Sequence, residues 1–544
     1  TLFDFVKKAY LAYFVVKQGD IRINIGRYIV FASNVQNGLK MLRYLQDIQI
    51  AAEFVKNNDS WQCEEVNLNN NFLHQLQDLT KTFSLLHYLR LDYNLIENLS
   101  PRFVPSFTLR VLSLKGNRIR HFDISSNQFK WLTYLDLSNN ILSVVKVQNM
   151  PDLELRLTGN PNDFELECNP QLTDLRYNRL QSYQIKQKKI YTAILLLDYN
   201  LFVDLHFLSS KPYLNTLKFL SCSHNLIRTI NEDFFDSAIK LEKLDLSYNC
   251  IKYIPNGFLS NKHTISHVNL SFNMITKVNS RDFLNMLGLQ DIGLYGNPIT
   301  VIPSGFLNLS SQLKSVAISL KHLQCLNIRE LSNTIEEIKF SGCEININDY
   351  LDFDKLTKIE LKSTVLTDWE LLHGTTGATT ISILRSNVTS MDFLYSVKAP
   401  YLADINLSFN RIATIKKAQL PTTYNLKCLD LRGNGIRLIS DFVYLFNKSI
   451  DYLNINRNYN PTERQFANYL DSLIAQKSWH IYYNLNLPMF DLINNFALPQ
   501  VVCLHSMCIP GKHIERIARH QSFGDNYGYT CPTVYSGHNE FKYL

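Results

Sequence analysis

The sequence lacks an apolar run long enough to cross a membrane, although 46% of its 544 residues are hydrophobic. A transmembrane helix needs about 20 consecutive, predominantly apolar residues. The most apolar stretch, residues 10–16, is short and is bracketed by Lys7, Lys8, Lys17 and Asp20. We therefore expect no membrane span within this chain.

The sequence also lacks a concentration of charge of one sign. Its 55 Lys and Arg residues and 48 Asp and Glu residues give a net charge of +7, which is small for this length. Nucleic-acid-binding surfaces usually show a clustered basic patch. The densest basic run, KQKK at residues 186–189, is typical of a solvated loop. These observations predict that no nucleic acid is a partner.

Catalytic signatures are missing as well. The chain contains no P-loop, no G-x-G-x-x-G, no H-E-x-x-H and no G-x-S-x-G. One cluster near the C-terminus could bind zinc through thiolates and imidazoles: Cys503, His505, Cys508, His513 and His520. The cysteine spacing does not match the usual zinc pattern, and Cys531 offers a disulfide partner. We therefore predict a disulfide-bonded tail, no cofactor, no metal and no enzymatic activity.

One phrase recurs along the chain, as LEKLDLSYNCI at residues 241–251, LTYLDLSNNIL at 132–142 and LADINLSFNRI at 402–412. Aligned on its Asn, the phrase returns mostly every 22 to 25 residues. The Leu-x-Leu part predicts a short strand with both leucines on one face. The Asn predicts a turn in which a buried amide bonds unpaired backbone groups. We expect this structural ladder to include Asn94, Asn117, Asn140, Asn249, Asn273, Asn297, Asn410 and Asn434.

No single phrase can bury its own apolar side, so neighbouring phrases must stack into a solenoid. The pattern resembles the leucine-rich repeat, and the resemblance covers about residues 61 to 479. It implies an α/β solenoid, a horseshoe of about 18 repeats with a parallel concave β-sheet. Return segments such as IPNGFLSN and IPSGFLNL resemble those of extracellular members.

Both open ends of such a solenoid need caps. We expect an N-terminal cap at residues 1–60, in which the alternation of DIRINIGRYIV predicts a strand or hairpin. The solenoid would then span 61–461 and a capping helix 462–480, since Thr462 and Gln465 form a capping box. Residues 481–544 would form a cysteine-containing tail.

Four consecutive Asn positions carry other residues, namely Lys321, Cys343, Thr364 and Ser386. A lysine in a buried slot would be costly. The pattern therefore predicts an irregular segment, which is either a local distortion of the coil or a break in curvature used by a partner.

Aromatic and charged residues recur at positions that are free of core packing. Protein interfaces favour aromatic side chains and Arg, although rings at these positions could also simply cover the edge of the sheet. The candidate binding residues on the concave face are Tyr93, Asp136, Arg156, Tyr177, Tyr199, Asp245, Tyr248 and Phe272.

The ten cysteines offer several disulfide partners, and the candidates are Cys63, Cys168, Cys325, Cys343, Cys503, Cys508 and Cys531. Cys325 and Cys343 lie in adjacent coils and could bridge, or Cys343 could simply fill its Asn slot. The three tail cysteines leave one over, so a disulfide-linked homo- or hetero-dimer is a further hypothesis.

Seven sequons fit the acceptor pattern for N-glycosylation: Asn58, Asn98, Asn269, Asn308, Asn387, Asn406 and Asn447. The repeat register places Asn269 and Asn406 on the concave face, where a glycan would cover neighbouring strands.

The cap running into WQCEEVNLNNN, and the tail with CLHSMC and TCPTVYSGH, resemble the secreted leucine-rich immune proteins of insects and Toll-type ectodomains. The chain departs from the former in having no heptad coiled coil, and from the latter in lacking multi-cysteine caps. The resemblance implies a secreted, extracellular protein that binds a protein ligand or effector in innate immune recognition or scaffolding. The alternative is the ectodomain of an adhesion or Toll-like receptor.

Overall fold

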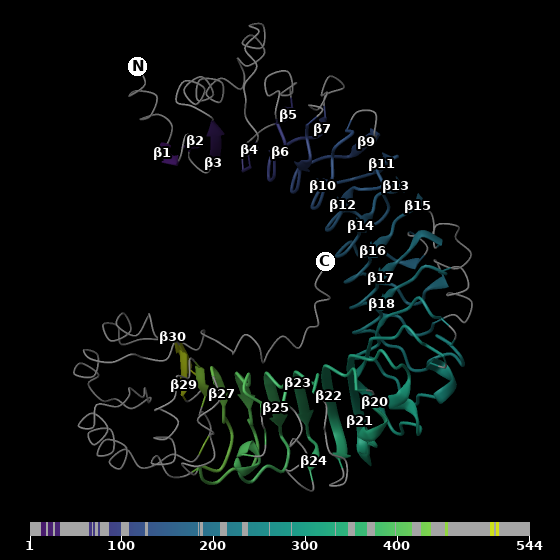
Figure 1. The fold of residues 1–544 in the computed structure, drawn as a ribbon. Coiled ribbons are helices and arrows are strands. Elements are labelled where there is room, and N and C mark those ends of the chain that lie inside the picture. Colours follow the sequence, from purple (N-terminus) through teal and green to yellow (C-terminus); the bar gives the residue numbers. More distant parts are fainter. Residues whose placement is uncertain are drawn as a thin grey trace, which may run out of the picture. The chain divides into compact units, whose positions relative to one another are not determined.

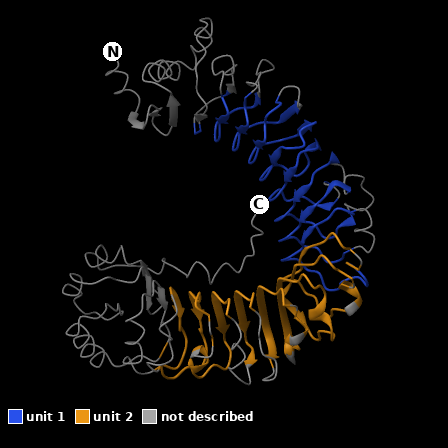
Figure 2. Cartoon of the chain, in the orientation of Figure 1, with its two compact units in different colours: residues 1–258 blue, residues 259–544 orange. Residues whose placement is uncertain are grey.

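The computed structural model describes chiefly residues 86–99, 108–125, 129–182, 189–206, 215–230, 238–331, 333–345, 354–366, 376–395, 399–415 and 426–436, together with short strands nearer the two ends. The chain divides into two compact units, residues 1–258 and 259–544 (Figure 2). We call them unit 1 and unit 2 and describe each by itself.

Unit 1 is built around a sheet of short parallel strands, each formed by one Leu-x-Leu phrase or its equivalent (Figure 1). The central residue of the strand aligns with the central residue of the next, as Leu112 does with Leu135. The two leucines of each Leu-x-Leu phrase, such as Leu244 and Leu246 on either side of Asp245, are fully buried. In order of pairing, these strands are β4 (Glu65–Asn67), β6 (Tyr88–Arg90), β8 (Val111–Ser113), β10 (Tyr134–Asp136), β12 (Glu154–Arg156), β14 (Leu172–Asp174), β16 (Ile194–Leu196), β17 (Phe219–Ser221) and β18 (Lys243–Asp245).

An antiparallel hairpin precedes the first parallel strand. β2 (Asp20–Ile25) pairs with both β1 (Ala12–Lys17) and β3 (Tyr28–Ala32). β3 in turn pairs antiparallel with β4, with Val30 opposite Val66. The alternating stretch at residues 20–32 thus forms strands that extend the sheet of the first coil.

The return segments of unit 1 also form parallel sheets. One contains β9 (His121–Ser125), β11 (Val144–Gln148), β13 (Glu165–Cys168) and β15 (Lys189–Ile190). A smaller one pairs β5 (Gln75–Leu76) with β7 (Asn98–Leu99). Alternate residues of β11, such as Val145 and Val147, are fully buried, so this second sheet encloses the core from the other side.

Unit 2 repeats the architecture with longer strands at its start. Its parallel strands, in order of pairing, are β19 (His267–Asn269), β20 (Asp291–Ile299), β21 (Ser315–Cys325), β22 (Glu337–Ile345), β23 (Lys358–Lys362), β25 (Thr380–Leu384), β26 (Asp404–Asn406), β27 (Cys428–Asp430) and β28 (Tyr452–Asn454). β24 (Val365–Leu366) pairs with the end of β22. β29 (Val501–Leu504) adds to β28, and β30 (Met507–Pro510) pairs antiparallel with β29.

Buried asparagines join consecutive coils within each unit. The Asn117 amide donates to the carbonyls of Leu91 at 3.0 Å and Leu114 at 2.9 Å, and its Oδ1 accepts from Ile96 N at 3.1 Å. Each Asn thus bonds its own turn and the preceding one, which pairs backbone groups that the turn would leave unsatisfied. The same burial, at most 8% exposed, is found at Asn94, Asn140, Asn160, Asn178, Asn200, Asn225, Asn249, Asn273, Asn297, Asn410 and Asn434.

The coil that carries Lys321 avoids placing an ammonium in the buried slot. Strand β21 pairs with β22 up to Ser319 opposite Ser341 and resumes at Gln324 opposite Cys343. The intervening residues bulge outward, so that Lys321 and His322 are exposed and Leu323 is 53% exposed. The irregular segment that the sequence predicts is therefore an extruded bulge, which spares the cost of burying the charge.

The described return segments of unit 2 contain 3-10 turns rather than α-helices: η3 (Ser280–Phe283), η4 (Phe306–Asn308), η5 (Ile328–Glu330) and η7 (Asp392–Tyr395). Phe283 and Phe306 are buried and meet edge to face at 5.7 Å between ring centroids. Among the described residues the fold is almost entirely strand and turn, so the α component implied by the resemblance is not found there. The helix expected at 462–480 lies outside the described residues.

Candidate protein-binding surface

The residue that precedes each Asn slot has a left-handed backbone. Tyr93, Tyr177, Tyr199 and Tyr248 have φ between 54° and 59°, a region that tyrosine seldom adopts. The conformation turns the chain off the strand and directs the ring to the edge of the coil. As a result Tyr93, Tyr177 and Tyr199 are 50%, 55% and 42% exposed.

Four of these rings stack on one another along unit 1. The centroids of Tyr177 and Tyr199 are 4.4 Å apart, those of Tyr199 and His224 4.2 Å, and those of His224 and Tyr248 4.1 Å. The planes are inclined by only 8–11°. We call Tyr177, Tyr199, His224 and Tyr248 the aromatic rail. Burial raises the pKa of Tyr199 above its ordinary value of 10.0, so its phenol stays a hydrogen-bond donor at neutral pH.

Tyr93 belongs to the same row but has no ring beside it in the next coil, where Gly116 takes the corresponding position. A Cβ atom on Gly116 would lie 2.6 Å from the Tyr93 ring, and Gly116 itself has φ of +68°. The absence of a side chain at Gly116 therefore leaves room for the Tyr93 ring. Lys115 Nζ lies 5.9 Å from the centroid of that ring.

Aliphatic side chains border the rail on the other side of the Asn slot. Leu201 is 39% exposed, Leu226 46% and Val203 46%, and Leu201 and Leu226 each follow a buried Asn directly. Exposed apolar groups that cluster in this way mark interaction sites more often than isolated ones do. The rail and these side chains make an amphipathic rim on unit 1.

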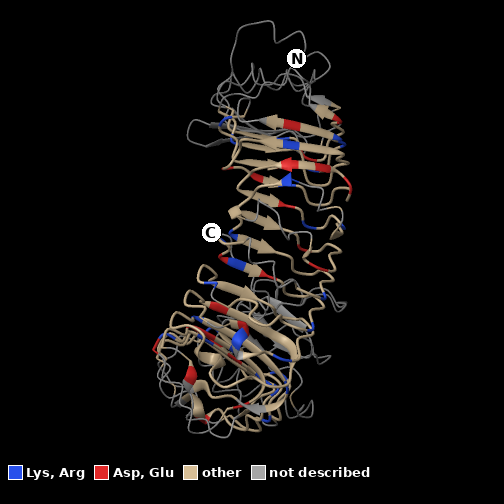
Figure 3. Ribbon diagram, turned by 90° about the vertical axis from the view of Figure 1, so that its right-hand side faces the viewer, with Lys and Arg blue, Asp and Glu red and all other residues tan. Residues whose placement is uncertain are grey.

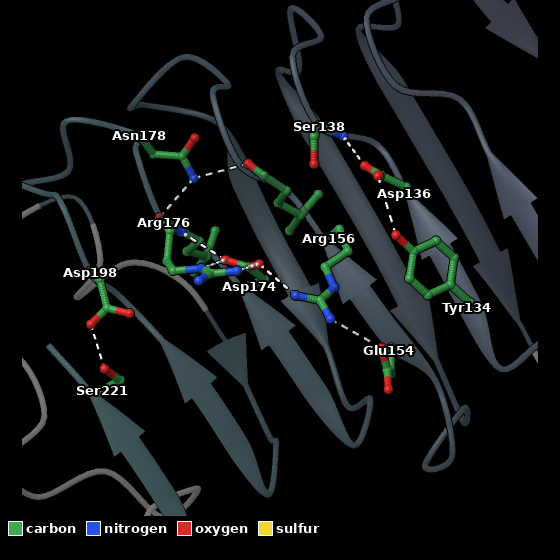
Figure 4. Close-up of polar contacts among 12 residues, drawn as sticks. Tyr134, Asp136, Ser138, Glu154, Arg156, Asp174, Arg176, Asn178, Asp198 and Ser221 are labelled. Atoms are coloured by element: carbon green, nitrogen blue, oxygen red, sulfur yellow. Dashed lines mark hydrogen bonds and ion pairs between the residues drawn. The ribbon is translucent and has the colours of Figure 1, made fainter. Parts of the chain in front are cut away.

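The concave strands beside the rail carry a hydrogen-bonded polar strip (Figure 4). Asp174 has only 1% of its side chain exposed and accepts from Arg156 Nη1 at 2.9 Å. It also receives both Nε and Nη2 of Arg176, each at 2.9 Å. Arg156 further contacts Glu154 at 3.2 Å, and Tyr134 Oη lies 3.4 Å from Asp136 Oδ2. We call Tyr134, Asp136, Glu154, Arg156, Asp174 and Arg176 the polar strip.

This network holds two guanidinium groups in place while leaving part of each accessible, since the side chains of Arg156 and Arg176 are 24% and 28% exposed. Burial alone would lower the pKa of Arg156, but the bonds to Asp174 outweigh it and raise that pKa. Burial, with a smaller effect of Asp136, raises the pKa of Tyr134 to about 12. The strip therefore keeps fixed charges and a neutral phenol at physiological pH.

Asp198 directly precedes Tyr199 of the rail. It accepts a hydrogen bond from Ser221 Oγ (Figure 4). It also accepts one from Ser223 N at 2.7 Å. Burial raises the pKa of Asp198, and the two serines only partly oppose that effect. The carboxyl is thus held by neighbouring backbone and hydroxyl groups and fixes the turn that carries Tyr199.

The candidate residues do not all share one surface. Tyr177, Tyr199 and Tyr248 lie in the rail, with Tyr93 farther along the same row, whereas Asp136 and Arg156 lie in the polar strip. The expectation that Asp245 is a free concave residue is wrong, because Asp245 is only 7% exposed and accepts from Ser247 N at 2.8 Å. Phe272 belongs to unit 2, where its ring meets Tyr295 edge to face at 5.8 Å.

Six residues of these surfaces were not among the candidates from the sequence: Tyr134, Glu154, Asp174, Arg176, Asp198 and His224. His224 occupies the rail position before Asn225, so the row of residues preceding each Asn would have revealed it. Arg176 and Asp198 each lie two residues after the end of a strand, at a position where the sequence shows no regular residue type.

The cysteine candidates are partly corrected. Cys168, Cys222 and Cys343 are buried thiols that form no disulfide, and Cys250 is a half-buried thiol that forms none either. Cys343 packs in its slot with Sγ 3.8 Å from Thr364 Oγ1, so it does not bridge Cys325. Cys428 is disulfide-bonded. The side chains of the other candidates, Cys63, Cys503, Cys508 and Cys531, lie outside the described residues.

Burial also separates the sequons. Asn406 is 2% exposed and its Oδ1 accepts from Ser408 N at 3.0 Å, so a glycan cannot be accommodated there in this fold. Asn98 and Asn308 are exposed, and Asn269 and Asn387 are half-buried. Asn58 and Asn447 lie outside the described residues.

No helix in the described part of the chain has the length and apolar character needed to cross a bilayer. Within the same residues, no group of three or more His, Cys, Asp or Glu side chains is arranged to hold a metal ion. The Cys and His cluster of the tail lies outside them.

Three solved structures similar to this chain are 17–19% identical to it in sequence. YopM from Yersinia enterocolitica WA-314 is 19% identical, with 76% of this chain and 91% of that chain covered and a TM-score of 0.46. A leucine-rich repeat protein of Leptospira interrogans is 19% identical, with 77% and 96% covered and a TM-score of 0.46. TLR13 in complex with ssRNA13 is 17% identical, with 72% and 77% covered and a TM-score of 0.40.

A search of curated proteins finds no match. Residues 215–273 match the family model of the leucine rich repeat. That segment includes Leu220, Leu244 and the slots at Asn225 and Asn249, which are the parts that build the strands and the ladder described above. The stacked parallel strands, the buried asparagines and this match together identify the chain as a leucine-rich repeat protein.

Proposed function

We propose that this chain is a binding protein rather than an enzyme, and that unit 1 contacts a protein partner through the aromatic rail and the adjoining polar strip. The observation that carries the proposal is the exposure of an ordered row of rings, Tyr177 and Tyr199 above all, beside exposed leucines. Tyrosine gives a large amphipathic contact at small entropic cost because it has few rotatable bonds.

The polar strip adds orientation to this contact. Arg156 and Arg176 are already fixed by Asp174, so less conformational freedom is lost when their accessible donors meet a partner. Exposed rings beside immobilised Arg groups are the combination found at the energetic centres of protein interfaces. Mixed charge on the strip favours a protein over a polyanion.

The finer proposal is a secreted, extracellular role in innate immune recognition or in scaffolding an effector. It is supported by the sequence resemblance of the cap and tail to secreted leucine-rich immune proteins. The alternative is the ectodomain of an adhesion or Toll-like receptor. A disulfide-linked dimer through Cys503, Cys508 or Cys531 is part of the same proposal, and a native sample that runs only as monomer on a non-reducing gel would exclude it.

The test is comparative affinity capture from the extracellular fluid of the source. The wild-type chain is compared with a double variant, Tyr177→Asn and Tyr199→Asn, because Asn tolerates the left-handed backbone at both sites. Tyr253→Ser is the matched control, since Tyr253 is 72% exposed and lies off the rail. We expect a partner that binds the wild type and the control but binds the double variant about 30-fold more weakly, the effect of losing roughly 2 kcal/mol. Equal capture by all three proteins would refute the proposal.

A further inference from the structure

A second surface lies in unit 2, where four cations lie at the end of a strand or beyond it in neighbouring coils. Lys362 ends β23 and is paired in register with Leu384, the last residue of β25. Arg385 N donates to Ser408 O at 3.1 Å, and Phe409 N donates to Arg432 O at 2.6 Å. These backbone bonds place the same edge of successive coils side by side. We call Lys362, Arg385, Arg411 and Arg432 the basic rim.

Phe409 lies in the middle of this rim and gathers two of its guanidinium groups. Arg385 Cζ is 5.4 Å from the centroid of the Phe409 ring, and Arg432 Cζ is 5.1 Å from it. The negative face of the ring attracts both cations. Arg411 follows the buried Asn410 and is exposed, so the positive charge extends beyond the ring.

Little negative charge compensates the basic rim. Arg432 approaches Asp430 at 3.7 Å. Within the described residues, no carboxylate lies within ion-pair distance of Lys362, Arg385 or Arg411. Elsewhere in the same unit strand lysines are paired, as Lys339 is with Glu360 at 3.0 Å and Lys358 with Glu337 at 3.9 Å. Charges of both signs occur on the described strands (Figure 3). The three cations without a carboxylate at ion-pair distance, Lys362, Arg385 and Arg411, are therefore a local feature.

We propose that the basic rim binds an acidic polypeptide segment, whose Asp or Glu side chains pair with Lys362, Arg385 and Arg411. The planar fork of a guanidinium matches a carboxylate with two parallel hydrogen bonds. Like charges held together repel one another, and an acidic partner removes that repulsion as well as adding contacts. This proposal concerns unit 2 and is independent of the partner proposed for unit 1.

A nucleic acid strand is the competing polyanion, and the structure favours it less. Single-strand binding uses a long basic groove together with ring faces on which bases stack. Here two guanidinium groups, those of Arg385 and Arg432, already lie near the Phe409 ring. The ring also lies against the Gly433 backbone, since a Cβ atom on Gly433 would be 2.5 Å from it. The ring is therefore committed to holding the arginines.

The experiment uses the full chain and a fluorescein-labelled poly-glutamate peptide of about ten residues, with binding followed by fluorescence anisotropy at roughly 0.15 M salt. The test variant combines Arg385→Asn and Arg411→Ala. Asn is chosen at the first site because Arg385 has φ of 48°, which Asn tolerates. Lys427→Ala is the matched control. Lys427 is an exposed cation of the same unit, but it lies before strand β27, whereas Arg432 of the basic rim lies after that strand.

We expect the double variant to weaken peptide binding by about tenfold or more and Lys427→Ala to change it less than about twofold. If the double variant does not fold, Lys362→Gln replaces it, with a smaller loss of about threefold. Unchanged binding by the rim variant would overturn the proposal, and so would an equal loss in the control. Tighter binding of an oligo-thymidine strand of similar length would instead assign the surface to nucleic acid.

Discussion

The buried amide of Asn249 should contribute far more to stability than its size suggests. Its Nδ2 donates to the carbonyls of Cys222 at 2.9 Å, Leu246 at 3.0 Å and Ser247 at 3.1 Å. Its Oδ1 accepts from the amide of Ile227 at 3.0 Å. Replacing Asn249 with Ala removes all four bonds at once and leaves no atom that can substitute for them.

The loss can be estimated from the groups that remain. A buried backbone group left without a partner costs about 1–3 kcal/mol. The Ile227 amide loses its acceptor, and the carbonyls of Cys222 and Leu246 lose well-aligned donors. At the low end of the range for each, Asn249→Ala should lower the free energy of unfolding by about 3–5 kcal/mol.

The assay is urea denaturation of wild type and variant, combined with hydrogen exchange at the Ile227 amide. Glu242→Ala is the control in the same coil, because Glu242 is exposed and forms a surface ion pair with Lys218 at 3.2 Å. That change should cost less than about 1 kcal/mol. If Asn249→Ala cost no more than the control and the Ile227 amide remained protected, the hydrogen-bonded slot would be wrong.

Three further outcomes follow from particular contacts. Gly116→Ala should destabilise the chain more than Gly305→Ala. Both glycines have positive φ, but a Cβ atom on Gly116 would lie 2.6 Å from the Tyr93 ring, whereas nothing lies within 4 Å of a Cβ atom on Gly305. Equal shifts in Tm would contradict this prediction. Burial raises the pKa of Asp198 above 3.8, so its neutral form stabilises the fold at low pH and that contribution is lost as pH rises through the raised value. The unfolding free energy of wild type minus that of Asp198→Asn should therefore fall between pH 3 and 7 in urea titrations, and a constant difference would refute the assignment. In secreted material, glycopeptide mapping should find sugar at the exposed Asn308 and none at the buried Asn406; an occupied Asn406 would contradict its burial.

The repeat could be predicted from the sequence because its determinants are local. Leu244 and Leu246 flank one residue, and that spacing alone sets a strand with a buried face. The Asn slot is equally local, since the amide bonds its own turn and the one before. The long strands β21 and β22 could not be predicted in the same way, because they depend on how neighbouring coils pair after the Asn is lost.

The binding surface was only partly predictable. The tyrosines before each Asn identify a row, but the sequence does not say whether the rings are exposed or cover the sheet. Asp245 shows the limit of pattern reasoning, because alternation assigns it to the concave side while the neighbouring side chains cover it. Arg176 depends on contact with Asp174 across one turn, which no periodic pattern encodes.

The aromatic rail follows from a match between two spacings. Adjacent strands of a sheet lie about 4.8 Å apart, and the rail centroids are separated by 4.1–4.4 Å, close to that value. Identical positions in successive coils therefore bring flat rings into contact whenever each coil carries one. Where the next coil has glycine instead, as at Gly116, the ring lies over the backbone and the row is interrupted. The aromatic rail therefore depends on an uninterrupted run of ring-bearing residues before Asn178, Asn200, Asn225 and Asn249. The substitution His224→Gly should divide the rail into two shorter, more mobile parts.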